Sequence, residues 1–265
     1  MTRLPLTLAP LILFATVTAG AAGLPDTGQD TCYNDSGADG ATASSRTSIS
    51  ADTGSHPRQD CRYGRDAAAA AGKLAKIGDG AKGFDYSKIA NNGAVLAAGS
   101  ALGAAGTDWA CTRDNITGLT WENKTGSISD LRYGGHTYTW YNSTVATNGG
   151  ADGDTGGNTC NATLPGNFCN TRAFVSALNT AALCTFTDWR LPSMRELLTL
   201  VYADSSVPSI DSVYFPNPPA TPFWTASPAA ADMTNAWFVD FADGYSSTGD
   251  KSRVYSVRAV RGSPF

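Results

Sequence analysis

The sequence predicts an α+β fold in which two helices are followed by antiparallel strands. Residues 171–182 and 193–201 carry apolar side chains at helical spacing, whereas residues 223–227, 236–241 and 254–261 are rich in aromatic and β-branched residues. Helices that precede a run of strands, instead of alternating with them, are typical of α+β domains. Six cysteines and 28 glycines further predict a loop-rich chain stapled by disulfides.

Residues 1–22 have the three regions of a secretory signal peptide. Arg3 precedes the apolar run 4–17, and the small residues 19–22 follow it. The apolar run is shorter than the roughly 20 residues that cross a bilayer. We therefore expect cleavage between residues 20 and 24, no membrane span, and a mature protein that is secreted, periplasmic or attached to the cell surface.

The charge of the chain argues against nucleic acid as a partner. The formal net charge is −4, and only 16% of the residues are charged. Phosphate binding requires a clustered basic surface, which this composition does not supply. Abundant Gly, Ser, Thr, Asn and Asp are instead typical of a turn-rich extracellular protein.

Residues 23–106 are predicted to form an irregular extension packed on the main domain. Most of this stretch lacks a sustained apolar period, although five consecutive alanines, 67–71, favour a short helix within residues 65–77. The main domain is expected over residues 107–265, where residues 119–122 alternate like a strand. Residues 148–161 are too polar and glycine-rich to form an element.

The second helix has a clear start signal. Ser193 is followed three residues later by Glu196, the spacing of a capping box in which each side chain bonds a free backbone N–H of the first turn. An apolar face follows at Met194, Leu197, Leu198 and Val201. Trp189 and Arg190, just before this helix, are expected to brace the core.

The six cysteines of the chain predict three disulfides. A helix over residues 171–182 would hold Cys169 and Cys184 roughly 20 Å apart, too far for a bridge. Among the remaining pairings we favour Cys32–Cys61, Cys111–Cys184 and Cys160–Cys169. The absence of a CxxC spacing argues against zinc or thioredoxin-like chemistry.

The C-terminal strands are expected to form a hairpin. Trp237, Val239 and Phe241 alternate on one face of residues 236–241, and a turn at Asp243-Gly244 leads towards residues 254–261. Core positions are expected for three tryptophans, with a ligand platform as the alternative: Trp121, Trp224 and Trp237.

Four segments in this order carry a family resemblance: residues 188–198, 223–227, 236–241 and 255–262. They resemble the Lcl C-terminal domain family. The resemblance implies a C-type-lectin-like fold with two helices and a small twisted antiparallel sheet, in an exported, non-enzymatic binding domain that is able to form homo-oligomers. Oxidases of the same superfamily use a late cysteine pair, but this chain has no cysteine after Cys184.

Catalytic signatures are not apparent in the sequence. His56 and His136 are its two histidines, and neither stands in an HExxH spacing. A GxSxG elbow is also missing. We therefore expect no enzymatic activity and no organic cofactor.

One loop offers hard oxygen ligands. Asp152, Asp154 and Asn158 carry oxygens at alternating positions, which suits calcium. The loop lacks the downstream glutamate of an EF-hand, so the alternative is a solvated loop that binds no metal.

Ligand binding is predicted for the C-terminal hairpin, residues 240–258. It brings together the candidate ligand-binding residues Asp243, Tyr245, Lys251, Arg253 and Tyr255, which are all expected to be exposed. Aromatic faces beside hydrogen-bonding groups suit sugar rings, and Lys or Arg suit sulfate or carboxylate. The alternative is an ordinary polar hairpin.

These observations predict an exported adhesin or surface-accessory module that recognises a glycan or an extracellular protein. The alternative is a structural or tip subunit of an extracellular or pilus-like assembly, in which the same surface is a subunit interface.

Overall fold

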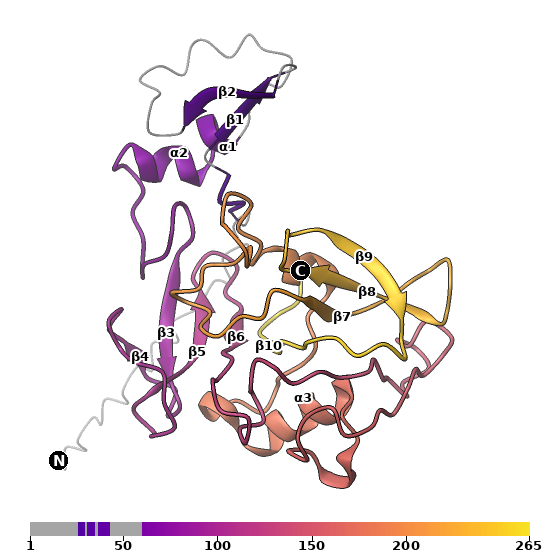
Figure 1. Ribbon diagram of the computed structural model, residues 1–265. Coiled ribbons are helices and arrows are strands. Elements are labelled where there is room, and N and C mark those ends of the chain that lie inside the picture. Colours follow the sequence, from indigo (N-terminus) through magenta and orange to yellow (C-terminus); the bar gives the residue numbers. More distant parts are fainter. Residues whose placement is uncertain (1–25, 30, 35–36, 43–59) are drawn as a thin grey trace, which may run out of the picture.

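The computed structural model describes residues 26–29, 31–34, 37–42 and 60–265 (Figure 1). The predicted signal peptide, residues 1–22, lies outside these residues. The architecture is mixed α+β, with short helices, a five-stranded and a three-stranded antiparallel sheet, and a separate two-stranded hairpin. Within the described residues, no helix is long and apolar enough to span a membrane.

The N-terminal part contains more regular structure than the sequence indicates. Strands β1 (Thr31–Asn34) and β2 (Gly37–Thr42) form an antiparallel hairpin, and α1 (Asp60–Tyr63) follows. The alanine run forms α2 (Arg65–Ala70) as predicted. This helix ends beside Gly72, whose φ of +65° a residue with a side chain rarely adopts.

The five-stranded sheet crosses the predicted boundary near residue 107. Its strand order is β10-β6-β5-β3-β4. Strands β3 (Tyr86–Ala90) and β4 (Val95–Leu96) come from the predicted extension, whereas β5 (Trp109–Asp114), β6 (Thr120–Glu122) and β10 (Val260–Arg261) come from the main domain. The prediction of irregular structure is therefore wrong for β3 and β4, because β3 is buried along its whole length and pairs with β5.

The three-stranded sheet contains β7 (Pro222–Pro228), β8 (Asn235–Asp240) and β9 (Ser246–Asp250) in that order. The turn between β8 and β9 lies at Asp243-Gly244, as predicted. The strand after the turn is β9, however, and not residues 254–261. A second turn at Asp250, whose carboxylate accepts from the Ser252 N–H at 2.8 Å, sends the chain away so that β10 can pair with β6.

Both predicted helices of the main domain are confirmed. Helix α3 (Thr171–Thr180) is capped by Asn170, whose Oδ1 accepts from the Ala173 N–H at 2.9 Å. Helix α4 (Met194–Leu198) begins with the predicted capping box, since Ser193 Oγ accepts from Glu196 N–H and Glu196 Oε2 accepts from Ser193 N–H. The 3-10 turns η3 (Pro165–Asn167) and η4 (Leu183–Thr185) flank α3. In Figure 1, α3 lies on the side of the molecule opposite the β1–β2 hairpin.

Strand β8 separates two hydrophobic cores. Ala236 and Phe238 belong to the core that contains α3, whereas Val239 and Phe241 belong to the core around α4. Trp237 is only half-buried and joins neither core, so the expectation that it lies in the core is wrong. Trp121 and Trp224 are fully buried, as predicted. Each such side chain stabilises the fold by about 1.5 to 3 kcal/mol through burial.

Two of the predicted disulfides are present. Cys111–Cys184 ties β5 to η4, and Cys160–Cys169 closes the loop before α3. Cys61 is also disulfide-bonded, but the side chain of its predicted partner, Cys32, lies outside the described residues. No free cysteine occurs in the described part of the chain.

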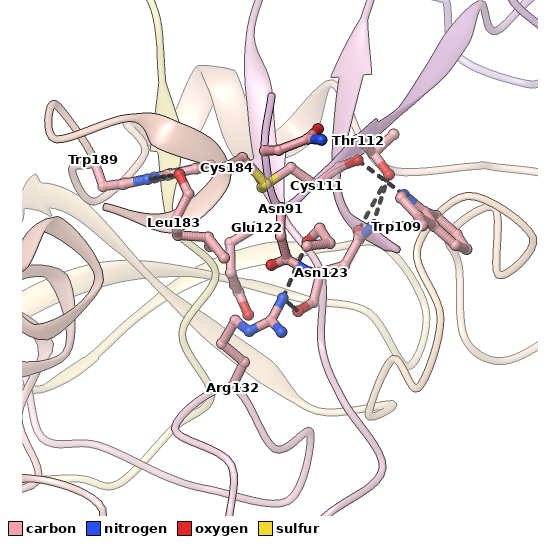
Figure 2. The surroundings of a disulfide bond; sticks show 12 residues. Asn91, Trp109, Cys111, Thr112, Glu122, Asn123, Arg132, Leu183, Cys184 and Trp189 are labelled. Carbon is pink, nitrogen blue, oxygen red and sulfur yellow. Dashed lines mark hydrogen bonds between the residues drawn. A yellow bond between two sulfur atoms is a disulfide. The ribbon is translucent and has the colours of Figure 1, made fainter. Parts of the chain in front are cut away.

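Around the Cys111–Cys184 disulfide, side chains donate hydrogen bonds to backbone carbonyl groups (Figure 2). Trp189 donates from Nε1 to the Leu183 carbonyl at 3.1 Å, and Arg132 donates to the carbonyls of Ala110 and Asn123. Trp189 is buried in this core, which confirms its predicted bracing role.

Candidate ligand-binding surface

The β8–β9 turn is held tightly against the body of the protein. Asp240 N–H donates to the Tyr245 carbonyl at 2.8 Å, and Gly244 N–H donates to the Asp240 carbonyl at 2.8 Å. A Cβ at Gly244 would come within 2.7 Å of Val201, and φ there is +81°. Only glycine fits this turn, which therefore presents its neighbours Asp243 and Tyr245 in a defined place.

An aromatic ladder runs from the core to this surface. Trp224 contacts Tyr255 with ring centroids 4.5 Å apart, Tyr255 contacts Phe238 at 5.1 Å, and Phe238 contacts Tyr245 at 6.0 Å. Gly249 in β9 allows this packing, because a Cβ there would lie 3.1 Å from the Tyr255 ring. The outermost ring, Tyr245, is 49% exposed. The ladder thus offers a rigid aromatic face to solvent.

The predicted binding residues differ in accessibility. Asp243, Tyr245 and Arg253 are exposed, and Tyr255 is half-buried within the ladder. Lys251 is only 2% exposed, so the prediction that it lies on the surface is wrong.

Three backbone carbonyls hold the ammonium group of Lys251. Its Nζ donates to Asn148 at 2.8 Å, to Ala151 at 2.7 Å and to Met233 at 2.6 Å, and it lies 4.3 Å from the centre of the Trp140 ring. These bonds use all three donors of an ammonium group. Burial lowers the pKa of Lys251, although Asp152 and Asp232 oppose the change. Lys251 therefore anchors the 148–151 loop to the strand β9 region.

The predicted calcium ligands are engaged in separate local bonds. Asp152 accepts from Asn148 Nδ2 at 2.6 Å, Asp154 accepts from Gly156 N–H at 2.7 Å, and Asn158 accepts from Ala162 N–H at 2.7 Å. All three residues are exposed. Within the described residues, no group of three or more His, Cys, Asp or Glu is arranged to hold a metal ion. Calcium binding by this loop stays a prediction.

A group of buried charges lies between the sheet and α3. Lys124 Nζ lies 3.1 Å from Glu122 Oε1 and 4.7 Å from the Phe174 ring centre, and both charged groups are buried. Burial lowers the pKa of Lys124 to about 8, although Glu122 opposes the shift. Arg258, also fully buried, donates to the Glu122 carbonyl at 2.7 Å. Because these charges are inaccessible, their role is to organise the core.

Two hollows along α3 were not anticipated from the sequence. One, of about 650 Å³, is lined by residues that include Phe168, Ala173 and Ala177. The other, of about 470 Å³, lies between the start of α3 and the residues around Arg190. The alanines of α3 share its apolar stripe with Phe174 and Leu178, but only these larger side chains are buried. The sequence signal that could have indicated these hollows is the presence of small alanines beside bulkier apolar residues on the same stripe of the helix.

Comparison with known proteins supports the family assignment. The family model for the Lcl C-terminal domain matches residues 110–261, which include all of β5 but its first residue, both helices of the main domain and the whole three-stranded sheet. No curated protein and no solved structure matches the chain. The match covers more than half of the chain. The chain belongs to the Lcl C-terminal domain family.

Proposed function

We propose that this protein is an exported, non-enzymatic binding protein, an adhesin or surface-accessory module, that recognises a glycan or an extracellular protein. The proposed binding surface is the β8–β9 hairpin, with Asp243 and Tyr245 at the turn between its strands and Arg253 in the turn that follows β9. We further propose that the α+β arrangement is a C-type-lectin-like fold, in keeping with the family.

The aromatic ladder carries this proposal. An exposed ring that rests on a buried stack loses little conformational freedom on binding, which favours affinity. The exposed Asp243 and Arg253 add hydrogen-bonding and charged groups to the hairpin that bears the ring. A sugar ring or an apolar protein side chain matches such a surface.

Export is supported by the cysteines. The two described disulfides, together with the disulfide-bonded Cys61, are typical of a protein that folds outside the cytoplasm. The signal-peptide pattern of residues 1–22 agrees with this interpretation.

A glycan array and an extracellular-protein array test the proposal. For a ligand that the arrays identify, Tyr245→Ala and Arg253→Ala should each weaken binding at least tenfold without a change in thermal stability. Tyr63→Ala is the matched control, because Tyr63 is a tyrosine of similar exposure, 43%, far from the hairpin in sequence and outside both hollows along α3. Equal binding by the Tyr245→Ala variant and the wild type would remove the hairpin as the site.

A structural or tip subunit of an extracellular assembly is the alternative function. Strand β9 is an edge strand of the three-stranded sheet, and such an edge can pair with a neighbouring subunit. Size-exclusion chromatography with light scattering distinguishes the two functions. If the protein is a structural subunit, Tyr245→Ala should reduce assembly instead of ligand binding.

A further inference from the structure

The two hollows lie on the two flanks of α3 and share part of their lining. Tyr141 and Arg172 line both of them. Residues of a helix are about 100° apart around its axis, which places Thr171 and Val175 on one flank of α3 and Ala173 and Ala177 on the other. Arg172 lies on the exposed ridge between these flanks. We call the two hollows, together with Tyr141 and Arg172, the α3 groove.

Both ends of the α3 groove have firm apolar walls. In the larger hollow, Phe168 stands next to Cys169, which the disulfide to Cys160 holds in place. In the smaller hollow, Trp140 is buried and its Nε1 donates to the Thr225 carbonyl at 2.8 Å, while Val175 and Leu191 complete the apolar lining. Apolar side chains of a partner therefore fit both hollows without rearrangement.

The charge of the groove is concentrated at its centre. Arg190 also lines the smaller hollow, but its guanidinium forms two bonds to the Glu196 carboxylate, at 2.8 and 2.6 Å. Arg172 is exposed and donates to Ser143 Oγ, and it has no carboxylate partner among the described residues. The groove thus carries one uncompensated positive charge between two apolar hollows.

We propose that the α3 groove binds an extended peptide segment of a partner protein, with an acidic side chain on Arg172 and an apolar side chain in each hollow. Alternate residues of an extended chain point the same way at about 3.3 Å per residue, so the outer two of five residues lie about 13 Å apart. A helix with its side chains is about 10 to 12 Å across, which is the scale of the separation between hollows on its two flanks. The matching motif is apolar-x-Glu/Asp-x-apolar.

A peptide explains the groove better than an acidic sugar does. A sugar acid would satisfy Arg172 but would place hydroxyl groups against the apolar walls, where they lose hydrogen bonds to water. Two apolar side chains instead gain from burial in both hollows. This site is separate from the hairpin surface and does not depend on the proposed function.

An array of acetylated, amidated pentapeptides tests the proposal with the full chain. The central residue is Glu, Gln or Lys, the first and last residues are Leu, Phe, Val or Thr, and the remaining two are Thr. Glu-centred peptides with two apolar ends should bind best, with a Kd at least tenfold lower than that of the same peptides centred on Gln. Arg172→Gln should abolish the difference in Kd between Glu-centred and Gln-centred peptides. Val175→Glu should weaken the binding of all peptides with apolar ends.

Control variants separate the α3 groove from other surfaces. Arg195→Gln removes an exposed arginine from α4 and should leave peptide binding unchanged, as should Tyr245→Ala in the hairpin. The proposal is overturned if the central residue or the apolar ends make no difference, or if Arg195→Gln acts like Arg172→Gln. Loss of peptide binding in Tyr245→Ala would also overturn it. Displacement of the peptide by equal concentrations of glucuronate would assign the groove to a sugar acid.

Discussion

Arg190 and Glu196 connect the segment before α4 to the cap of that helix. Two guanidinium nitrogens of Arg190 donate to the two carboxylate oxygens of Glu196, at 2.8 and 2.6 Å, while Glu196 also accepts from the Ser193 N–H. Arg190 further donates to the Gly262 carbonyl at 3.2 Å, which links this cap to the C-terminal segment. One carboxylate therefore supports both the start of a helix and a long-range contact.

The two residues of the capping box should contribute unequally to the free energy of unfolding. Ser193→Ala removes one cap bond and should lower the free energy of unfolding by about 1 kcal/mol. Glu196→Ala removes the other cap bond and leaves Arg190 without its partner, so we expect a loss of about 2 to 3 kcal/mol. Urea unfolding measures both, with Arg195→Ala as the control in the same helix. Equal losses for the two cap variants would show that the Arg190 pair adds nothing.

Acid should weaken the same contact. Burial alone would raise the pKa of Glu196, but the hydrogen bonds from Arg190 and Ser193 outweigh it and lower the pKa from its ordinary value of 4.5. Because the carboxyl pKa is lowered in the folded protein, the ionised Glu196 stabilises the fold at pH values above 4.5. This contribution is lost as the pH falls below 4.5 and through the folded-state pKa. Urea midpoints from pH 7 to 3 should fall less steeply for Glu196→Gln than for the wild type. Parallel curves would contradict the assignment.

Neighbouring basic residues of the hairpin should respond differently to substitution. Lys251→Met leaves three carbonyl acceptors without their donor, and we expect a loss of about 3 kcal/mol in the free energy of unfolding. Arg253→Ala changes an exposed side chain and should alter stability by no more than about 0.5 kcal/mol. Thermal and urea unfolding of the two variants provide the comparison. A stable Lys251→Met protein would mean that the ammonium group does not hold the 148–151 loop.

Alkaline pH should strengthen the fold through Lys124. Burial lowers its pKa to about 8 from the ordinary 10.5. Between these values the unfolded chain keeps the proton that the folded protein releases, so stability rises with pH in this window, and below it Lys124 adds no pH dependence. The wild type should gain urea resistance from pH 8 to 10 relative to the double variant Lys124→Met, Glu122→Gln. The same pH slope in both proteins would exclude Lys124 as the titrating group.

The two described disulfides should differ in their contribution. Cys111–Cys184 joins residues 73 apart in sequence, whereas Cys160–Cys169 joins residues 9 apart. From loop-closure entropy, paired Cys→Ala replacements should cost about 4 kcal/mol for the first and about 3 kcal/mol for the second. Urea unfolding of the two double variants measures this order. A larger loss for the 160–169 pair would show that its main effect is on the native loop.

Several local features were predictable from the sequence because neighbouring residues determine them. The capping box at Ser193 and Glu196 depends on a spacing of three residues, and the Asp243-Gly244 turn depends on a residue that tolerates positive φ. The length of α3 excluded a bridge between Cys169 and Cys184, in agreement with the observed Cys111–Cys184 disulfide.

The tertiary structure alone decided which side chains face solvent. Lys251 is polar in sequence, yet its ammonium meets the carbonyl of Asn148, which lies 103 residues earlier in the chain. The α3 alanines share the apolar period of Phe174 and Leu178, but the larger side chains fill the core and leave Ala173 and Ala177 beside a hollow. A sequence pattern identifies the face of an element, whereas burial depends on what distant segments pack against that face.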